Sequence, residues 1–478
     1  MGAEKEEMAK AKIKGILDYY LGESLATLCL ESPRVHIIVG DICKTNLGVS
    51  RADAQLLAQN IDMVLNSVQA IPLDNDKDLY VENVQAVLNL IEFAKKIENL
   101  VDVVYLSTLS IASGDVKDKL LVHFNEFDSD IGQKMRFYYA KTKLQAEKEL
   151  EKARAEGLSV TIYRIGDLLL PAPKGKLPQN LSETSFFNLF SAYVNIGIVP
   201  RDFVNPKVSR VDDVARAIVA IQNRKGKKEY TFHVHSEQVI NLGHVLNSAP
   251  IHMEIQEVSN IEFVNLLYKN FGRLGFKEYI ENIIARSDWI SEKEVTQYHI
   301  DSEKTMKYLE QLNFKWHEVD LDVFDALVEV ALTKRIQFLS KLPVVQDFNS
   351  AELFSLAKKG KQVLYAPAEV IAWEGDFNDK FIIIWDGFVD SSKRNVIGWE
   401  NSIGIYKNGD FFGSASLADG VTISQTTLEA MNQDVLILEF KAEAIRDFMK
   451  AKPEFALRLI QKLHEQLDRL KWLWINAN

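Results

Sequence analysis

The sequence predicts an α/β layer fold followed by a smaller all-β domain. Three observations support this: short, mostly Val- and Ile-rich runs alternate with helical patterns up to about residue 340, the pattern changes there, and turn signals then recur between short strands. Short apolar runs without clean alternation are typical of strands that are buried on both faces. Because strands that alternate with helices need crossover connections, the first region is expected to form a parallel sheet.

The first region supplies the strands and helices of this sheet. The expected buried strands are Val35–Val39, Met63–Leu65, Val101–Ser107 and Val160–Arg164, and the expected helices between them are Val81–Ile97 and Tyr139–Glu156. Residues 236–340 have mostly helical patterns and carry no motif. Such a region either builds the substrate side of the cleft in an α/β enzyme or simply covers the sheet.

The second region has the turn pattern of a small all-β domain. The turn signals are Glu374–Gly375–Asp376, Trp385–Asp386–Gly387, Lys407–Asn408–Gly409–Asp410 and Ala418–Asp419–Gly420, and the closing helices are Ala442–Met449 and Glu454–Trp474. In the last helix one apolar stripe is formed by Leu457, Ile460, Leu463, Leu467, Leu470 and Trp474. The stripe suits a partner helix, although packing on the helix's own domain is the commoner use.

Composition narrows the class of protein. The 478 residues suffice for two or three domains, and 47% hydrophobic with 26% charged residues is an ordinary globular balance. A net charge of −11 disfavours a nucleic-acid partner, and no run of about 18 apolar residues predicts a membrane span. The two cysteines, Cys29 and Cys43, form no Cys-x-x-Cys motif, and the N-terminus has no apolar signal segment. These features predict reduced thiols and a cytoplasmic protein.

The strongest chemical signal is the pair Tyr139 and Lys143, four residues apart on a predicted helix and therefore on one face. A nearby ammonium favours the phenolate and is expected to lower the pKa of Tyr139, so that the phenol can protonate an oxyanion as a hydride arrives. The spacing alone is weak, because the 15 Tyr and 56 Lys and Arg residues produce up to about two such pairs by chance. An exposed amphipathic helix start would explain it equally well.

Thr108 strengthens the interpretation because it ends a predicted strand about thirty residues upstream. A hydroxyl at the carboxyl end of a parallel strand lies at the crevice where ligands bind, so Thr108 could hold a substrate oxygen beside Tyr139. A hydrogen-bonded turn hydroxyl is the alternative. No metal site stands out: His233 and His235 share one face of a likely strand, but nothing nearby completes a ligand set, and a structural role is favoured.

Several segments together resemble a known family. In order they are Val35-His36-Ile37-Ile38-Val39-Gly40-Asp41-Ile42, Asn83 in Val81–Val84, Tyr105-Leu106-Ser107-Thr108, Tyr139 through Glu147, Arg164-Ile165-Gly166 and Val208–Val214. Over about residues 10–335 they resemble the extended short-chain dehydrogenase/reductases, most closely the thioester-reductase and fatty-acyl-reductase branch. The resemblance implies a Rossmann-like domain over residues 1–340. It also implies that NADPH is used to reduce acyl thioesters on CoA or carrier proteins to aldehyde or alcohol.

The resemblance also implies residue roles. Thr108, Tyr139 and Lys143 match the catalytic triad, with Tyr139 as the acid and Lys143 lowering its pKa and binding the nicotinamide ribose. The residues assigned to cofactor binding are Asp41, Ile42, Asn66, Tyr139, Lys143 and Arg164, and of these Asp41 matches the residue near adenine. Ile165 departs from the pattern, because the family usually has Pro there.

The phosphate-binding part of this pattern is missing. The sequence has no Gly-x-x-Gly-x-x-Gly turn, Gly272-Arg273-Leu274-Gly275 is a lone fragment in a helical region, and the helix Lys5–Cys29 resembles the family segment just before Val35. The first βαβ unit is therefore expected to be absent, which removes several charge-assisted bonds of roughly 1.5–3 kcal/mol each and exposes a sheet edge. The chain is then truncated, completed by a partner chain, or non-catalytic. The choice between NAD and NADP is not readable, and only the resemblance favours NADP.

Residues 341–478 resemble a cyclic-nucleotide-binding domain, a jelly-roll with flanking helices. The matching residues are Glu374-Gly375-Asp376, Phe381–Ile384 with Asp386-Gly387, and Gly409-Asp410-Phe411-Phe412-Gly413. Ser414 and Ser424 stand where the family has the Glu for the ribose and the Arg for the phosphate, and no Arg or Lys occurs between Lys407 and Lys441. Because a desolvated phosphate needs a cation, cyclic nucleotide binding is disfavoured and a docking or dimerisation role is favoured.

Three hypotheses follow. The first is an NAD(P)H-dependent reductase of acyl-CoA or carrier-bound acyl thioesters. The second is a non-catalytic interaction protein that has lost its dinucleotide loop and its cyclic nucleotide site. The third, weaker one is regulation through the C-terminal domain by a ligand other than a cyclic phosphate.

Overall fold

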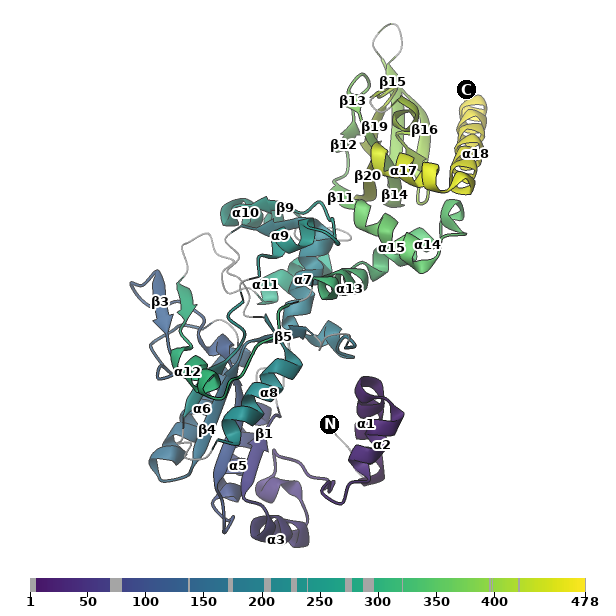
Figure 1. The fold of residues 1–478 in the computed structure, drawn as a ribbon. Coiled ribbons are helices and arrows are strands. Elements are labelled where there is room, and N and C mark those ends of the chain that lie inside the picture. Colours follow the sequence, from purple (N-terminus) through teal and green to yellow (C-terminus); the bar gives the residue numbers. More distant parts are fainter. Residues whose placement is uncertain are drawn as a thin grey trace. The chain divides into compact units, whose positions relative to one another are not determined.

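The computed structural model describes residues 6–68, 80–135, 138–170, 175–201, 208–224, 230–238, 240–270, 277–286, 296–319, 321–394, 397, 399–419 and 422–477. The chain forms two compact units that alternate along the sequence (Figure 1). Unit 1 comprises Met1–Leu181, Asn205–Ile240 and Ala285–Asp320, and unit 2 comprises Ser182–Val204, Asn241–Ile284 and Leu321–Asn478. The division into residues 1–340 and 341–478 stays a prediction, and the fragment Gly272–Gly275 lies outside the described residues.

Unit 1 is built on a parallel sheet, as the sequence predicts. Its strands, in spatial order, are β1 (Met63–Asn66), β2 (Asp102–Thr108), β4 (Val160–Ile165) and β8 (Thr231–Val234), and all three pairings are parallel. Two smaller parallel pairs accompany it: β3 (Leu121–Phe124) with β10 (Gln297–Ile300), and β5 (Asp167–Leu170) with β7 (Val208–Arg210).

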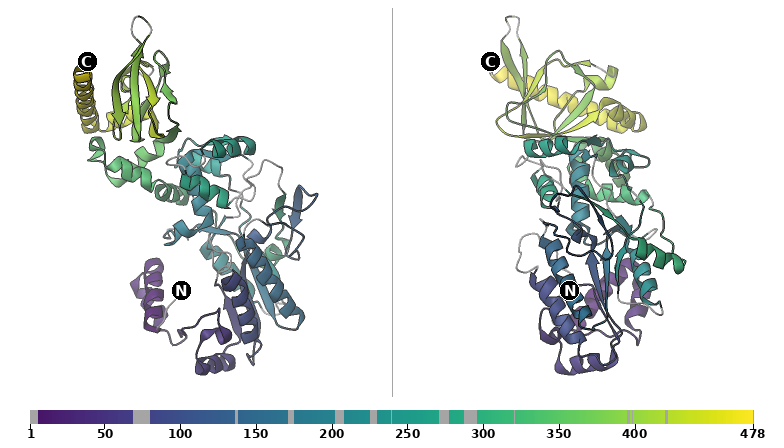
Figure 2. Two further views of the ribbon diagram at one scale, coloured as in Figure 1. Left: turned by 180° about the vertical axis from the view of Figure 1, so that it is seen from behind. Right: turned by 90° about the vertical axis from the view of Figure 1, so that its left-hand side faces the viewer.

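Helices cover both faces of this sheet (Figures 1 and 2). One face packs against α3 (Arg51–Asn60), α5 (Ala86–Ala94) and α6 (Tyr138–Ala155), and the other against α8 (Val211–Gln222) and α12 (Glu303–Gln311). Successive strand residues alternate between the two cores: Val103 and Tyr105 face α5 and α6, whereas Val104 faces α8. The remaining helical segments of this region are α1 (Glu6–Leu21), α2 (Glu23–Leu30), η1 (Thr45–Gly48), η2 (Val81–Gln85), η3 (Leu109–Ile111) and η4 (Leu181–Glu183).

The predicted strand Val35–Val39 is wrong, because this segment has no assigned strand structure. A strand needs a neighbour to pair its backbone groups, and in the described ranges this segment has none. The edge strand β1 also lacks a second partner: in the described ranges it pairs with β2 alone. Met63 and Leu65 on β1 are 42% and 48% exposed. Within the described residues the sheet therefore ends at β1, along a partly apolar edge, while the absence of a first βαβ unit stays a prediction.

Unit 2 contains the predicted jelly-roll, an antiparallel β-sandwich with C-terminal helices. One sheet has the order β11 (Lys361–Tyr365), β20 (Val435–Lys441), β14 (Lys380–Asp386), β17 (Phe411–Phe412). The other has the order β12 (Val370–Ala372), β19 (Thr427–Ala430), β15 (Phe388–Arg394), β16 (Glu400–Lys407), and β13 (Phe377–Asn378) pairs with β18 (Thr422–Ile423). Ile382, Ile384, Val389 and Leu428 lie in the shared core.

Helices make up most of the remainder of unit 2. Before the sandwich they are α7 (Ser185–Ile196), α9 (Leu242–Asn247), α10 (Asn260–Asn270), α11 (Lys277–Arg286), α13 (Asp322–Ala331), α14 (Thr333–Ser340), η5 (Pro343–Val345) and α15 (Ser350–Lys359), with the parallel pair β6 (Ile198–Pro200) and β9 (Gln256–Val258) among them. The sandwich is flanked by α16 (Ala415–Asp419), α17 (Ala442–Ala451) and α18 (Pro453–Ala477). Among the described residues no helix combines the length and the hydropathy required to cross a bilayer.

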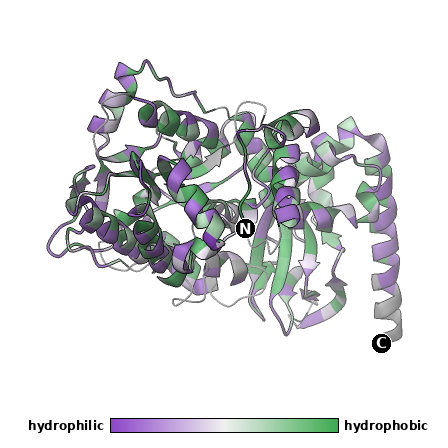
Figure 3. Cartoon of the chain, turned by 90° about the horizontal axis from the view of Figure 1, so that it is seen from below, coloured by the Kyte–Doolittle hydropathy of each residue, from purple (hydrophilic) through white to green (hydrophobic). Residues whose placement is uncertain are grey.

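Of the predicted apolar stripe on α18, three of the four residues whose side chains are described are exposed, and Leu463 is half-buried. Phe455 and Leu459 are buried, whereas Leu457, Ile460 and Leu467 of the stripe are exposed. Figure 3 shows hydrophilic residues interspersed along this helix, which ends at the C label. The side chains of Leu470 and Trp474 lie outside the described part of the structure.

Alanine substitutions at two glycines in turns of the sandwich test whether Gly413 is required for steric reasons. Both Gly413 and Gly375 have positive φ, 85° and 90°, but a Cβ at 413 would overlap the Lys380 carbonyl oxygen, whereas one at 375 meets nothing within 4 Å. We expect Gly375→Ala to cost about 1–2 kcal/mol for the left-handed backbone alone, and Gly413→Ala to cost clearly more. Urea unfolding followed by tryptophan fluorescence measures both, and equal losses would contradict the steric argument.

Candidate active site

The end of β2 and the start of α6 bring Thr108, Tyr139 and Lys143 together in unit 1. Thr108 is the last residue of β2, while Tyr139 and Lys143 lie one turn apart on α6. The Tyr139 phenol forms a hydrogen bond with the Thr108 side chain, and the Lys143 ammonium lies 6.0 Å from the Tyr139 ring centroid. The Thr108 hydroxyl also accepts a hydrogen bond from the Ser110 N–H at 3.1 Å. The three predicted side chains are therefore neighbours, while their catalytic roles stay predictions.

Lys143 is held in a buried position. Its side chain is fully buried, and its Nζ donates to the Leu106 carbonyl oxygen at 3.3 Å and lies 4.8 Å from the Tyr105 ring centroid. Burial lowers the pKa of Lys143 to about 8, although the charge of Glu147 acts in the opposite direction. The buried side chain of Lys143 is therefore a weaker base than an exposed lysine.

The expected lowering of the Tyr139 pKa is not found. Burial raises the pKa of this phenol well above its usual value, and the hydrogen bond with Thr108 offsets the rise only in part. The physical reason lies in the position of Lys143, whose ammonium is directed to ring faces and to a main-chain carbonyl. The raised pKa favours the protonated phenol of Tyr139, and its catalytic role stays a prediction.

Asn83 and Thr142 fix the first turn of α6. Asn83 is buried, and its amide donates to the Thr142 hydroxyl at 3.2 Å; that hydroxyl donates in turn to the Tyr139 carbonyl oxygen at 2.9 Å. Sequence reasoning noted Asn83 only within a motif and did not single out Thr142. The Tyr-x-x-x-Lys pattern gave no signal for this link, because it connects segments 59 residues apart.

A buried ionic network lies on the same face of α6. Arg164 on β4 donates from Nε and Nη2 to the Glu147 carboxylate at 3.1 and 2.8 Å, and both side chains are at most 1% exposed. Ser107 donates to the same carboxylate. The guanidinium also lies 3.2 Å from the His233 Nε2 and 5.3 Å from the Phe124 ring centroid. Cofactor binding by Arg164 stays a prediction; the structure shows its side chain engaged in the core.

His233 and His235 are both buried and engaged. His233 Nδ1 lies 2.9 Å from the Asp301 carbonyl oxygen, and desolvation, with the neighbouring Arg164 charge, lowers its pKa to about 3. A neutral ring can donate to Asp301 and accept from Arg164 at the same time. His235 lies 2.8 Å from the Ser236 carbonyl oxygen and 2.6 Å from the Ser302 hydroxyl.

The other predicted cofactor residues lie on β1, which is next to β2 in the sheet, and in the segment before η1. Asp41 accepts from the Cys43 N–H at 3.0 Å and pairs with Lys44 at 3.2 Å, and these contacts hold the pKa of its carboxyl below its usual value. Ile42 packs partly buried against the α5–α6 core. Asn66 ends β1, is buried, and accepts from the Val68 N–H at 2.9 Å. Their contacts with a cofactor stay predictions.

The phosphate cassette of the sandwich carries no cation of its own. Ser414 precedes α16, and the Ser424 main chain is tied to Asp376 and Gly375 by hydrogen bonds of 2.8 Å. Arg446 reaches the cassette, but its Nη1 donates to the Ser416 carbonyl oxygen at 2.7 Å. Whether this module binds a cyclic phosphate stays a prediction.

Comparisons with known families support the two-part interpretation. Residues 1–218 match an NAD-binding family model described as male sterility protein, and residues 362–452 match the cyclic nucleotide-binding domain. The predicted recognition of a reductase-type Rossmann domain followed by a cyclic-nucleotide-binding-like domain is thereby confirmed, and so is a domain type that takes a dinucleotide. No curated protein matches the chain.

Solved structures share the fold of the reductase region. A thiolation-reductase di-domain from an archaeal non-ribosomal peptide synthetase is 23% identical, with a TM-score of 0.55 over 68% of this chain and 67% of that one. The terminal R domain of the myxalamid PKS-NRPS pathway is 20% identical, with a TM-score of 0.57 over 70% and 82%. The reductase domain of a Mycobacterium tuberculosis non-ribosomal peptide synthetase is 17% identical, with a TM-score of 0.53 over 69% and 83%. At these identities the similarity establishes the fold.

Removing one partner of the buried ion pair tests its role. In Arg164→Met the Glu147 carboxylate is left buried without its cation, so we expect a loss of about 3–5 kcal/mol in the free energy of unfolding. The double variant Arg164→Met/Glu147→Met removes both charges and should regain much of this loss. Urea unfolding measures all three proteins, and a single variant as stable as the wild type would contradict the assignment.

Proposed function

We propose that the chain is an NAD(P)H-dependent reductase that converts acyl-CoA or carrier-bound acyl thioesters to aldehyde or alcohol. The observation that carries the proposal is the hydroxyl, phenol and ammonium of Thr108, Tyr139 and Lys143 at the carboxyl end of β2. In doubly wound sheets this end of the strands forms the crevice where ligands bind. The match of residues 1–218 to an NAD-binding family model supports the same conclusion.

The roles follow from the local chemistry. Tyr139, which keeps its proton because burial raises its pKa, donates that proton to the oxygen that becomes negative when the thioester carbon is reduced. Thr108 holds the same oxygen through its hydroxyl, and Lys143 stabilises the phenolate that remains. Bound NAD(P)H supplies the hydride. The carbon–sulfur bond of the resulting hemithioacetal then breaks, its hydroxyl proton passes to the sulfur, and the thiol of CoA or of the carrier protein leaves the aldehyde behind. NADP rather than NAD is favoured by the family resemblance alone.

The residues present fit one end of this cofactor. Tyr139 and Lys143 would hold the nicotinamide ribose, and the buried Tyr105 hydroxyl close to Lys143, which makes no hydrogen bond within the described chain, supports a polar ligand there. The pyrophosphate end does not fit, because no Gly-rich turn occurs in the sequence and the β1 edge beside it is open. We propose that a strand–turn–helix unit supplied from outside the described sheet completes this end.

Tyr139→Phe tests the proton donor. We expect the rate of thioester-dependent NADPH oxidation to fall about 10²–10⁴-fold, the usual contribution of a positioned general acid. Tyr138→Phe is the matched control, because Tyr138 is the neighbouring phenol on α6 and has no assigned role. The assay uses acyl-CoA and acyl-carrier substrates, with the chain alone and with a Gly-rich strand–turn–helix unit fused to it. Equal rates in wild type and Tyr139→Phe would refute the role of Tyr139.

A second candidate is a non-catalytic interaction protein. Two observations favour it: the absent dinucleotide turn, and the serines that replace the charged residues of the cyclic nucleotide cassette at 414 and 424. In this case both modules keep their folds and serve docking, and the C-terminal module is a docking or regulatory element. The cytoplasmic location and the CoA or carrier-protein partner remain predictions from the sequence.

Calorimetry separates the two candidates. The interaction protein should show no binding of NADPH, because several phosphate hydrogen bonds of roughly 1.5–3 kcal/mol each are absent. The reductase should bind NADPH saturably, at least after the strand–turn–helix unit is added. Micromolar binding by the chain alone would contradict the second candidate. No binding and no turnover, even with the added unit, would contradict the first.

A further inference from the structure

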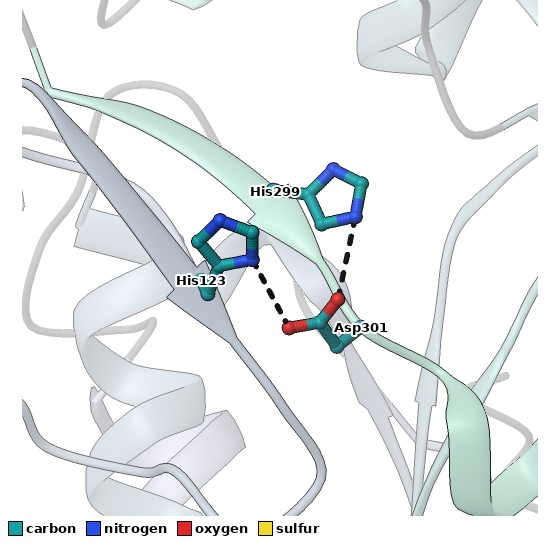
Figure 4. A group of neighbouring side chains, drawn as sticks. All are labelled: His123, His299 and Asp301. Carbon is teal, nitrogen blue, oxygen red and sulfur yellow. Dashed lines mark ion pairs between the residues drawn. The ribbon is translucent and has the colours of Figure 1, made fainter.

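The small sheet of β3 and β10 places two histidines side by side in unit 1. His123 and His299 are direct partners in the parallel register, and their ring centroids are 5.0 Å apart. Asp301 follows β10 and lies between the two rings, with one carboxylate oxygen toward each (Figure 4). Sequence analysis did not find this group, because His123 and His299 are far apart in the chain and have no recognisable spacing.

The geometry suits a tetrahedral metal ion. The His123 Nδ1 lies 3.4 Å from Asp301 Oδ2, and the His299 Nε2 lies 3.3 Å from Asp301 Oδ1. One ligand atom from each residue can be chosen so that all lie within 4.8 Å of one another. In a tetrahedral site with bonds of ~2.0–2.1 Å, neighbouring ligand atoms stand roughly 3.3–3.4 Å apart. The ligand atoms, now within 4.8 Å of one another, would have to move closer to reach this separation, and the exposed side chains leave room for such a movement.

Charge and exposure distinguish this group from a second cluster in unit 1. In that cluster, Asp212 and Asp213 already pair with Arg210 and Arg216, so a cation there would meet two guanidinium groups. The ion-pair partners of Asp301 in the described residues are the two histidines. Their side chains are 65% and 60% exposed, so a metal keeps access to water at its remaining position.

We propose that His123, His299 and Asp301 bind one Zn²⁺ ion and leave a fourth position open to water. Two imidazoles with one carboxylate form a donor set that zinc accepts, and three protein ligands with an open position are typical of accessible zinc sites. The site lies outside the group of Thr108, Tyr139 and Lys143 and does not depend on the reductase activity.

Such an ion would link distant parts of the chain. β3 and β10 are about 170 residues apart in sequence and form a sheet of only two strands, which is marginal by itself. The carbonyl oxygen of Asp301 also contacts the ring of His233, which contacts Arg164 in the buried network. Bound Zn²⁺ would thus stabilise the folded state around β3 and β10, and this stabilisation would grow with the logarithm of the ratio of free Zn²⁺ to the dissociation constant.

Titration of the full, metal-stripped chain with Zn²⁺ tests the proposal. We expect one ion per chain and a rise in the thermal unfolding midpoint with Zn²⁺. The variants His123→Asn and His299→Asn should each weaken binding about 100-fold or more, because even outer-shell changes cost 10–100-fold, and should abolish the thermal rise. His464→Asn is the control, since it is an exposed histidine on α18 with a neighbouring Asp468 and should bind zinc as the wild type does.

Co²⁺ gives an independent readout, because a tetrahedral site with nitrogen ligands should produce visible absorption that both variants lose. Circular dichroism checks that the variants fold. If a histidine variant does not fold, Asp301→Asn, which removes the third proposed ligand, is tested in its place. The proposal is overturned if the wild type shows no saturable binding below a dissociation constant of ~100 μM. It is also overturned if His123→Asn and His299→Asn bind Zn²⁺ as tightly as the wild type.

Discussion

The buried pair of Arg164 and Glu147 fixes how α6 sits on the parallel sheet. The pair joins the helix to β4, and Ser107 joins the same carboxylate to β2. Charges this deeply buried gain little net stability, because desolvation cancels most of their attraction, but an unpaired charge at the same place is very unfavourable. The pair therefore acts mainly through geometry: any shift of α6 that separates the two side chains is penalised.

This constraint reaches the candidate active site through helical periodicity. Tyr139, Lys143 and Glu147 are spaced four residues apart on α6, so one face carries the phenol, the ammonium and the anchoring carboxylate. The anchor places Lys143 in a dry environment, where burial lowers its pKa, and it places Tyr139 where burial raises its pKa. The two shifts have the same cause, because desolvation disfavours the charged form of each group. The proposed proton donation requires this arrangement: Tyr139 is protonated before the reaction, and the nearby Lys143 can stabilise the phenolate that proton transfer leaves.

The sequence was informative where local patterns dominate and silent where distant segments meet. The apolar runs at β2 and β4 and the helical spacing of α6 were predicted within one or two residues. The run Val35–Val39 was equally strand-like, but a strand forms only with a partner, and propensity carries no information about partners. The Arg164–His233 contact spans 69 residues and the His123–His299 pairing spans more, so neither has a local signature. The sequence predicted a lowered pKa for Tyr139, whereas burial raises it. The Tyr-x-x-x-Lys spacing indicates a nearby cation but contains no information about desolvation of the phenol.

Both modules build packed cores although the sequence has no Gly-rich dinucleotide turn and no Arg or Lys between Lys407 and Lys441. In the sheet of unit 1, the strands from β1 to β8 build two apolar cores without the Gly-rich turn, because that turn contributes backbone N–H groups rather than core side chains. In the sandwich, Ser414 and Ser424 replace charged residues on the surface of a core made by Ile382, Ile384 and their neighbours. A phosphate site adds little to the stability of its fold, so its loss leaves the architecture recognisable. This separation explains why family models match both modules, whereas ligand binding has to be argued from individual side chains.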